Sequence, residues 1–125
     1  MPISYDVRQH LVAVEITDDM TAPDILAFYE RLAADPRFQP GTPFLVDARG
    51  VTSAPPAGPL EATALAAVRA VVFAVSTKSA ALVSSEWMYG IVRQWATMSE
   101  PGNLVTRPFF DELEARRWLG VPPDA

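Results

Sequence analysis

Two short segments near the start of the chain alternate between apolar and polar residues. Residues 3–7 carry apolar side chains at every second position, and residues 12–16 repeat the pattern. A period of two is typical of a strand with one buried face. The connection between them, Gln9–His10, is short, so we expect an antiparallel hairpin.

The next segment has helical spacing. Thr21 is a suitable cap, and the apolar residues that follow predict one buried helix face: Ile25, Phe28, Tyr29 and Leu32. Asp35–Pro36 should end this helix, because the residue before a proline avoids helical backbone angles.

The rest of the chain alternates between strands and helices. Residues 44–48 are apolar on both sides, as expected for a parallel strand covered by helices. A proline-rich loop over 51–59 follows. We then expect a helix over 60–75, a strand over 80–84, a helix over 85–98, a strand over 103–107 and a helix from Asp111 to the stop at Gly120.

These elements predict an α/β fold with a mixed sheet of about five strands: an N-terminal antiparallel hairpin, then helix–strand alternation, with about four helices. We expect one domain over residues 1–121 and a short flexible tail over 122–125.

Composition narrows the function classes. Of 125 residues half are apolar and a fifth are charged, and the net charge is −5. The negative sign disfavours binding to nucleic acid, which needs a positive surface. The chain has no cysteine, which excludes disulfides and thiolate metal sites. The start lacks the pattern of a secretion signal, and the apolar run near 64–75 is broken by Arg69. We expect a cytoplasmic protein with no stable membrane insertion.

Polar residues at strand ends are the candidate ligand site. Asp47 and Arg49 end the first central strand, and ligands in such folds gather beyond the carboxyl ends of strands. Three further residues end or follow neighbouring strands and could line the same crevice: Ser84, Ser85 and Arg107. The alternative is structural, with Asp47 capping the turn or pairing with Arg49.

No catalytic motif stands out. The one histidine, His10, lies in the predicted hairpin turn, where it cannot serve a buried catalytic triad. The sequence has no metal-ligand spacing and no glycine-rich phosphate loop. We therefore predict a protein that is not an enzyme and has no cofactor or metal. A weaker hypothesis is an enzyme that uses Asp47, Arg49 and Arg107 on a small anionic substrate.

The helix over 85–98 carries more apolar surface than one buried stripe requires. A second subunit or another protein partner could cover the excess, since tryptophan, tyrosine and methionine are typical of interface cores. The candidate interface residues are Trp87, Met88, Tyr89, Val92 and Trp95. Packing within the domain and a groove for a hydrophobic ligand are the alternatives.

The order and spacing of several short motifs resemble the STAS superfamily of anti-sigma-factor antagonists. They are more similar still to uncharacterised bacterial proteins described as STAS-like or CRAL-TRIO-like. The motifs span nearly the whole chain: Leu11–Val14, Ala34–Phe38, Leu45–Asp47 with Arg49–Gly50, Tyr89–Gly90, Phe109, and Ala115 with Trp118–Leu119.

The resemblance implies binding to a protein partner, switched in that superfamily by phosphorylation of a serine after the central strand. The corresponding hydroxyls here are Thr52 and Ser53, which prolines separate from the next helix. Ser53 is the candidate phosphorylation site, and an ordinary loop hydroxyl is the favoured alternative.

Residues and resemblance together predict a non-enzymatic STAS-like interaction or regulatory module that forms homodimers. The alternative function is binding of a lipid or other small apolar ligand. It is suggested by the CRAL-TRIO-like resemblance and by the alanine-rich helix over 60–75, which leaves room for a cavity.

Overall fold

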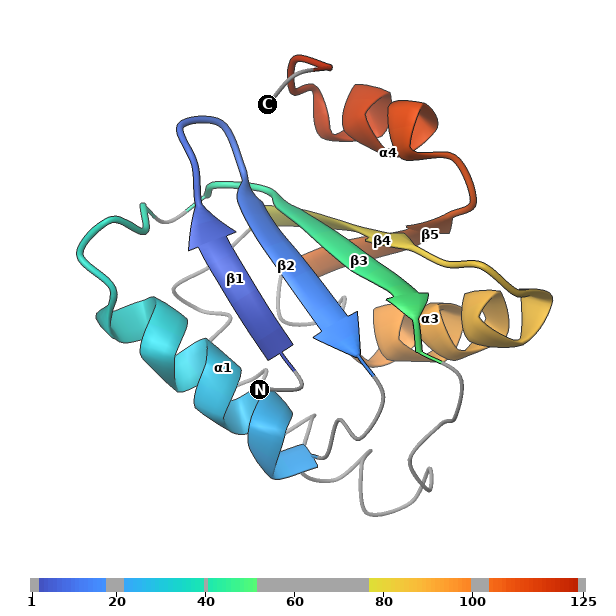
Figure 1. The fold of residues 1–125 in the computed structure, drawn as a ribbon, viewed down its shortest axis with the longest axis horizontal. Helices are drawn as coiled ribbons and strands as arrows, with labels where there is room; N and C mark the ends of the chain where they lie inside the picture. Colours follow the sequence, from blue (N-terminus) through green and yellow to red (C-terminus); the bar gives the residue numbers. More distant parts are fainter. Residues whose placement is uncertain (1–2, 18–21, 40, 52–76, 100–103, 124–125) are drawn as a thin grey trace.

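The computed structural model describes residues 3–17, 22–39, 41–51, 77–99 and 104–123. Within these ranges five strands form one sheet and three helices pack against it (Figure 1). The strands are β1 (Ile3–Val7), β2 (Val12–Thr17), β3 (Phe44–Gly50), β4 (Thr77–Leu82) and β5 (Leu104–Phe109). The helices are α1 (Ala22–Ala34), α3 (Glu86–Ser99) and α4 (Glu112–Leu119).

This architecture confirms the predicted α/β fold with a mixed five-stranded sheet. The described helices number three, where the sequence predicted about four, and the predicted helix over 60–75 lies outside the described residues. No helix in the described ranges is long and apolar enough to cross a membrane.

The sheet follows the order of the sequence, β1-β2-β3-β4-β5. β1 pairs antiparallel with β2, and every later pair is parallel. The Arg8 amide donates a hydrogen bond to the Leu11 carbonyl over 2.9 Å, which closes the predicted hairpin around Gln9–His10. The hairpin therefore projects from the end of the sheet at which the parallel strands begin.

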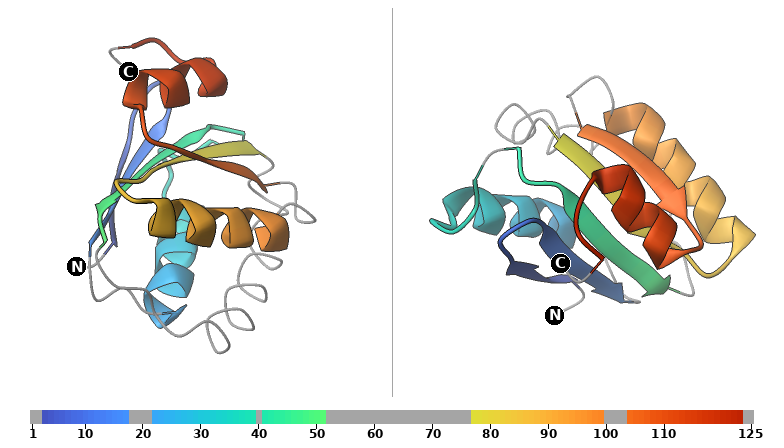
Figure 2. Two further views of the ribbon diagram at one scale, coloured as in Figure 1. Left: turned by 90° about the vertical axis from the view of Figure 1, so that its right-hand side faces the viewer. Right: turned by 90° about the horizontal axis from the view of Figure 1, so that it is seen from above.

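The helices lie on both faces of the sheet. Figure 2 shows α1 and α3 on one face and α4 on the other. Alternate residues of each strand supply the two faces. In β3, for example, Phe44 packs under α1, while its neighbour Leu45 packs under α4.

The core beneath α1 is built from large side chains. Phe28, Tyr29 and Leu32 are buried against the two N-terminal strands and Phe44, as their helical spacing predicted. Asp35 follows the last residue of α1, so the expected end of the helix is confirmed.

α4 is short and is fixed at both ends by its caps. The Asp111 carboxylate accepts a hydrogen bond from the Leu113 amide over 2.9 Å, and Gly120 has a φ of 75°, a left-handed angle that suits glycine. Ala115 and Leu119 are buried against β3 and β4. These contacts confirm both predicted ends of the helix.

Three strands differ from their predicted bounds by two residues or more, and the first of them, β3, runs past its predicted end at 48 to Gly50. β4 begins at Thr77 and ends at Leu82, whereas the prediction was a strand over 80–84. The early start was missed because the first residues of β4 are polar and do not belong to an apolar run in the sequence. β5 extends past the predicted end at 107 to Phe109 and includes Pro108. Proline is tolerated there because β5 lies at the edge of the sheet, where one side of the strand needs no backbone donor.

Candidate functional site

The carboxyl ends of three parallel strands meet at one edge of the molecule. Asp47 pairs with Leu82, and Leu82 pairs with Phe109. Beyond this row the Val83 amide donates to the Phe109 carbonyl over 2.9 Å. The segments that follow, which start α3 and α4, therefore lie close together. We call this region the carboxyl edge: residues 47–51, 83–89 and 109–113.

Asp47 and Arg49 form a complete local clamp at the carboxyl edge. The Arg49 amide and Nε both donate to Asp47 Oδ1, over 3.1 and 3.0 Å, and Nη2 donates to Oδ2 over 2.9 Å. A bulge lies here, because two steps of β2, from Glu15 to Thr17, face three of β3, from Asp47 to Gly50. The bulge lets the Arg49 amide bond a side chain instead of the neighbouring strand.

The clamp continues into α4 as a chain of alternating charges. Arg49 Nη2 lies 3.7 Å from Glu112 Oε1, and Arg116 Nε lies 3.3 Å from Glu112 Oε2. Arg116 is 9% exposed, whereas the side chains of Arg49 and Glu112 are nearly half exposed. This charge network joins the end of β3 to the first turn of α4.

The electrostatics of the network favour binding and positioning over proton transfer. Hydrogen bonds from Arg49 hold the pKa of Asp47 below its ordinary value. A carboxylate stabilised in this way is a poor general base. His10 lies in the hairpin at the opposite edge of the sheet. Among the described residues, no group of three histidine or carboxylate side chains could hold a metal ion.

The structure brings three of the five predicted crevice residues together. The Ser84 hydroxyl donates to the Arg49 carbonyl over 3.1 Å, so Ser84 joins the Asp47–Arg49 clamp. Ser85 caps α3 instead: its Oγ accepts a hydrogen bond from the Met88 amide over 3.2 Å. Arg107 pairs with Ala80 along the strand and lies over the ring of Trp118, away from the clamp.

The predicted interface on α3 needs a correction. Met88 and Val92 are 6% and 7% exposed and pack against Ala81 and Val83, so they belong to the core and cannot contact a partner. The predicted alternative of packing within the domain thus accounts for these two residues. The side chain of Trp95 lies outside the described residues.

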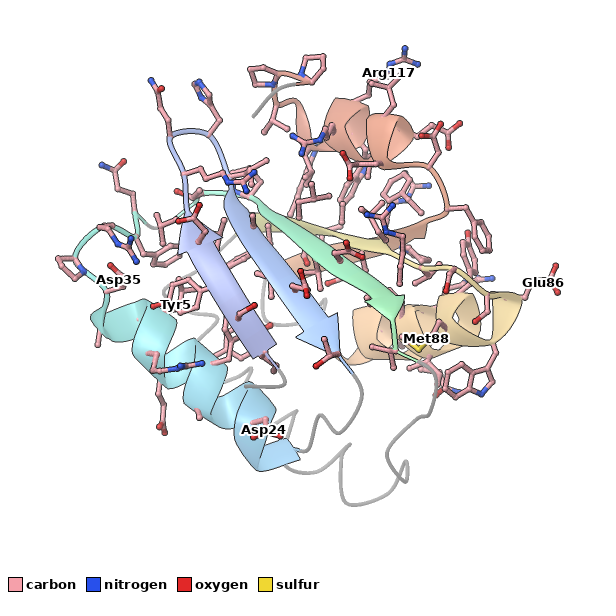
Figure 3. All side chains as sticks on the ribbon, viewed as in Figure 1. Tyr5, Asp24, Asp35, Glu86, Met88 and Arg117 are labelled. Atoms are coloured by element: carbon pink, nitrogen blue, oxygen red, sulfur yellow. The ribbon has the colours of Figure 1, made fainter. Side chains whose placement is uncertain are left out.

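The remaining two predicted interface residues lie at the surface or close to it. Trp87 is 46% exposed. Tyr89 is half-buried, and its ring stacks on Phe110 with 5.2 Å between centroids and 7° between planes. Figure 3 shows how α3 turns its residues at this end: Met88 points under the sheet, while Glu86 projects outward.

Sequence reasoning missed the contribution of Phe110 and Leu113, which are 55% and 43% exposed. The pair Phe109–Phe110 could have indicated the position of Phe110, because neighbouring residues at the end of a strand point to opposite faces of the sheet. Phe109 packs on Trp118 beside α4, while Phe110 reaches Tyr89 of α3. We call Trp87, Tyr89, Phe110 and Leu113 the carboxyl-edge patch.

Two further predictions fall on residues that the structure does not describe. Ser53, the candidate phosphorylation site, lies in the range 52–76. The alanine-rich helix that suggested a cavity for an apolar ligand lies in the same range. Both remain predictions from the sequence.

Comparison with known proteins supports the fold. No protein-family model and no curated protein matches the chain. Among solved structures, the chain is similar to an uncharacterized protein of the DUF3478 family with a SpoIIAA-like fold, from Shewanella loihica PV-4. The TM-score is 0.64 and the identity 15%, over 94% of this chain and 91% of that one. The chain thus has a SpoIIAA-like fold, which is the STAS-like fold that its sequence predicted.

Proposed function

We propose that this SpoIIAA-like chain is a non-enzymatic interaction module that forms a homodimer through the carboxyl-edge patch. The observation that carries the proposal is the exposure of Trp87, Phe110 and Leu113 within segments that meet at one edge of the sheet. Large apolar side chains left exposed at one end of a sheet are typical of protein interfaces, and tryptophan, tyrosine and phenylalanine are enriched there.

A second copy of the chain fits the chemistry of the patch. In a two-fold dimer the same surface meets itself, so the surface must be self-complementary. Aromatic rings and a leucine meet this condition, because uncharged apolar side chains can pack against copies of themselves without repulsion between like charges. Acidic residues flank the patch along the chain: Glu86, Asp111 and Glu112. Dimerisation brings these acids together, so added salt strengthens the dimer.

The charge network has a supporting role in this proposal. Arg49 and Glu112 join the end of β3 to α4, and Phe110 and Leu113 flank the start of that helix. A fixed α4 holds the two apolar side chains in one geometry. Side chains that are already ordered lose less entropy when a partner binds.

Sedimentation velocity of the wild type and of Phe110→Glu tests the proposal. We expect a concentration-dependent dimer in the wild type and a weakening of about tenfold or more in the variant, because a charge would then lie at the centre of the contact. Val105→Glu is the matched control: Val105 is 42% exposed but lies on β5 outside the patch. A wild type that stays monomeric at high concentration, or a control as weak as Phe110→Glu, contradicts the proposal.

A further inference from the structure

Two cations from neighbouring strands converge on one aromatic ring at the far end of α4. Trp118 lies in the last turn of α4, and its ring packs on Phe109 with 5.6 Å between centroids. Lys78 Nζ of β4 lies 5.2 Å from the centroid of the Trp118 ring, and Arg107 Cζ of β5 lies 5.7 Å from it. We call Lys78, Arg107 and Trp118 the cation–tryptophan cluster.

The strand register keeps the two cations together. Lys78 pairs with Val105 and Arg107 pairs with Ala80, so the two residues are diagonal neighbours on adjacent strands. Both project to the face of the sheet that α4 covers. Two positive charges so placed repel each other, and each gains only a partial compensation from the electron-rich face of the ring.

Several other cations of the described chain have a carboxylate beside them. Arg37 and Arg49 each lie 2.9 Å from an aspartate oxygen, and Arg116 lies 3.3 Å from Glu112. Within the described ranges, neither Lys78 nor Arg107 has a carboxylate partner. Lys78 donates one hydrogen bond, to the Trp118 carbonyl over 3.4 Å. An ammonium has three donors and a guanidinium five, so the cluster retains most of its donors.

We propose that the cation–tryptophan cluster is a binding site for a phosphate group. Arg107 offers the planar fork that matches two phosphate oxygens, and Lys78 offers a point charge to the third. The two positive charges match a phosphate dianion better than a singly charged carboxylate. Lys78 Nζ and Arg107 Cζ lie 5.2 and 5.7 Å from the centroid of the Trp118 ring, and Phe109 packs against that ring.

This site is independent of the proposed dimer. It involves the last turn of α4 and the strand residues Lys78 and Arg107, whereas Phe110 and Leu113 of the carboxyl-edge patch lie at the opposite end of α4. Salt also distinguishes the two surfaces, because it screens the attraction of the cluster for an anion but screens repulsion at the dimer contact.

NMR of the ¹⁵N-labelled protein tests the proposal, with the Trp118 indole resonance assigned by loss in Trp118→Phe. Inorganic phosphate is titrated at constant ionic strength, with acetate and potassium chloride as parallel arms. We expect a saturable shift of the Trp118 indole with phosphate, a weaker effect with acetate and none with chloride. O-phosphoserine, a phosphate monoester, should match inorganic phosphate.

Two variants localise the effect. Arg107→Gln removes the exposed guanidinium and should weaken phosphate binding by about tenfold, as expected for a charged hydrogen-bond partner. Arg117→Gln is the matched control, because Arg117 projects from the outer side of α4 (Figure 3) and should bind as the wild type does.

Three results overturn the proposal: a shift that does not saturate, a shift that chloride reproduces, or an Arg107→Gln variant that binds phosphate like the wild type. Arg107 is exposed, so its replacement leaves the core intact and this variant decides the outcome.

Discussion

Two Asp-x-Arg turns in this chain make the same three hydrogen bonds and differ in what surrounds them. At the end of α1, Arg37 donates its amide and Nε to Asp35 Oδ1 over 2.9 and 3.1 Å, and Nη2 to Oδ2 over 2.9 Å. Asp47 and Arg49 repeat this pattern at the end of β3 within 0.2 Å. We call them the Asp35 turn and the Asp47 turn.

The neighbours of the two turns set their roles. The Asp35 side chain is 9% exposed, and the Tyr5 hydroxyl donates a further hydrogen bond to it over 2.9 Å. Tyr5 in turn packs edge-on against Phe28. The Asp47 side chain is 35% exposed, and its arginine reaches Glu112 at the surface. The Asp35 turn is hydrogen-bonded to Tyr5, which packs in the core beneath α1. The Asp47 turn lies at the carboxyl edge, where Phe110 and Leu113 remain exposed.

The largest expected contrast between the two regions is in stability. Leu32 lies on the buried face of α1 and is 0% exposed, so Leu32→Ala should lower the free energy of unfolding by about 3 kcal/mol. Leu113 of the carboxyl-edge patch is 43% exposed, and Leu113→Ala should change it by no more than about 0.5 kcal/mol. Urea denaturation of the two variants at low concentration checks this. Equal losses would mean that the patch belongs to the core.

A smaller contrast concerns the turns themselves. Tyr5→Phe removes the hydroxyl that bonds Asp35 and should cost about 1 kcal/mol of unfolding free energy. Arg49→Gln breaks the exposed Asp47 turn and should cost less than about 0.5 kcal/mol. Thermal unfolding followed by circular dichroism compares them. A larger loss in Arg49→Gln would show that the charge network is a main source of stability.

The two turns should also differ in their response to acid. Hydrogen bonds from the paired arginine lower the pKa of both carboxyls, and the shift is larger at Asp35. A carboxyl with a lowered pKa stabilises the fold fully above its ordinary pKa of about 3.9 and loses this effect as the pH falls through the folded value. The slope of stability between about pH 5 and 2.5 should therefore flatten more in Asp35→Asn than in Asp47→Asn. Urea midpoints across this range measure the slope, and equal flattening would contradict the contrast.

Much of the fold could be predicted because apolar periodicity is local. The hairpin, α1 and β3 follow from alternation and helical spacing within each segment, and the caps at Asp111 and Gly120 follow from residue type. The bounds of β4 and β5 could not be predicted in the same way. Thr77 and Pro108 lie in strands because of their neighbours in the sheet, which the local pattern does not contain.

Less of the candidate site than of the fold could be predicted from the sequence. The pairing of Asp47 with Arg49 is local and was among the predicted alternatives. The contact of Arg107 with Trp118 depends on how α4 lies across β5. The broad apolar arc of α3 includes Met88 and Val92, which the sheet covers, and Tyr89, which Phe110 partly covers. Which apolar residues stay exposed depends on such tertiary contacts.

A residue-resolved dilution series tests the central claim, that the carboxyl edge binds a second copy while the α1 region is complete in one chain. Amide and indole resonances are followed by ¹H–¹⁵N NMR as the protein is diluted. We predict concentration-dependent shifts at Trp87, Tyr89, Phe110 and Leu113, and none at Tyr5, Phe28 or Leu32. Shifts centred on α1 and β1, or none at any concentration, would contradict the claim.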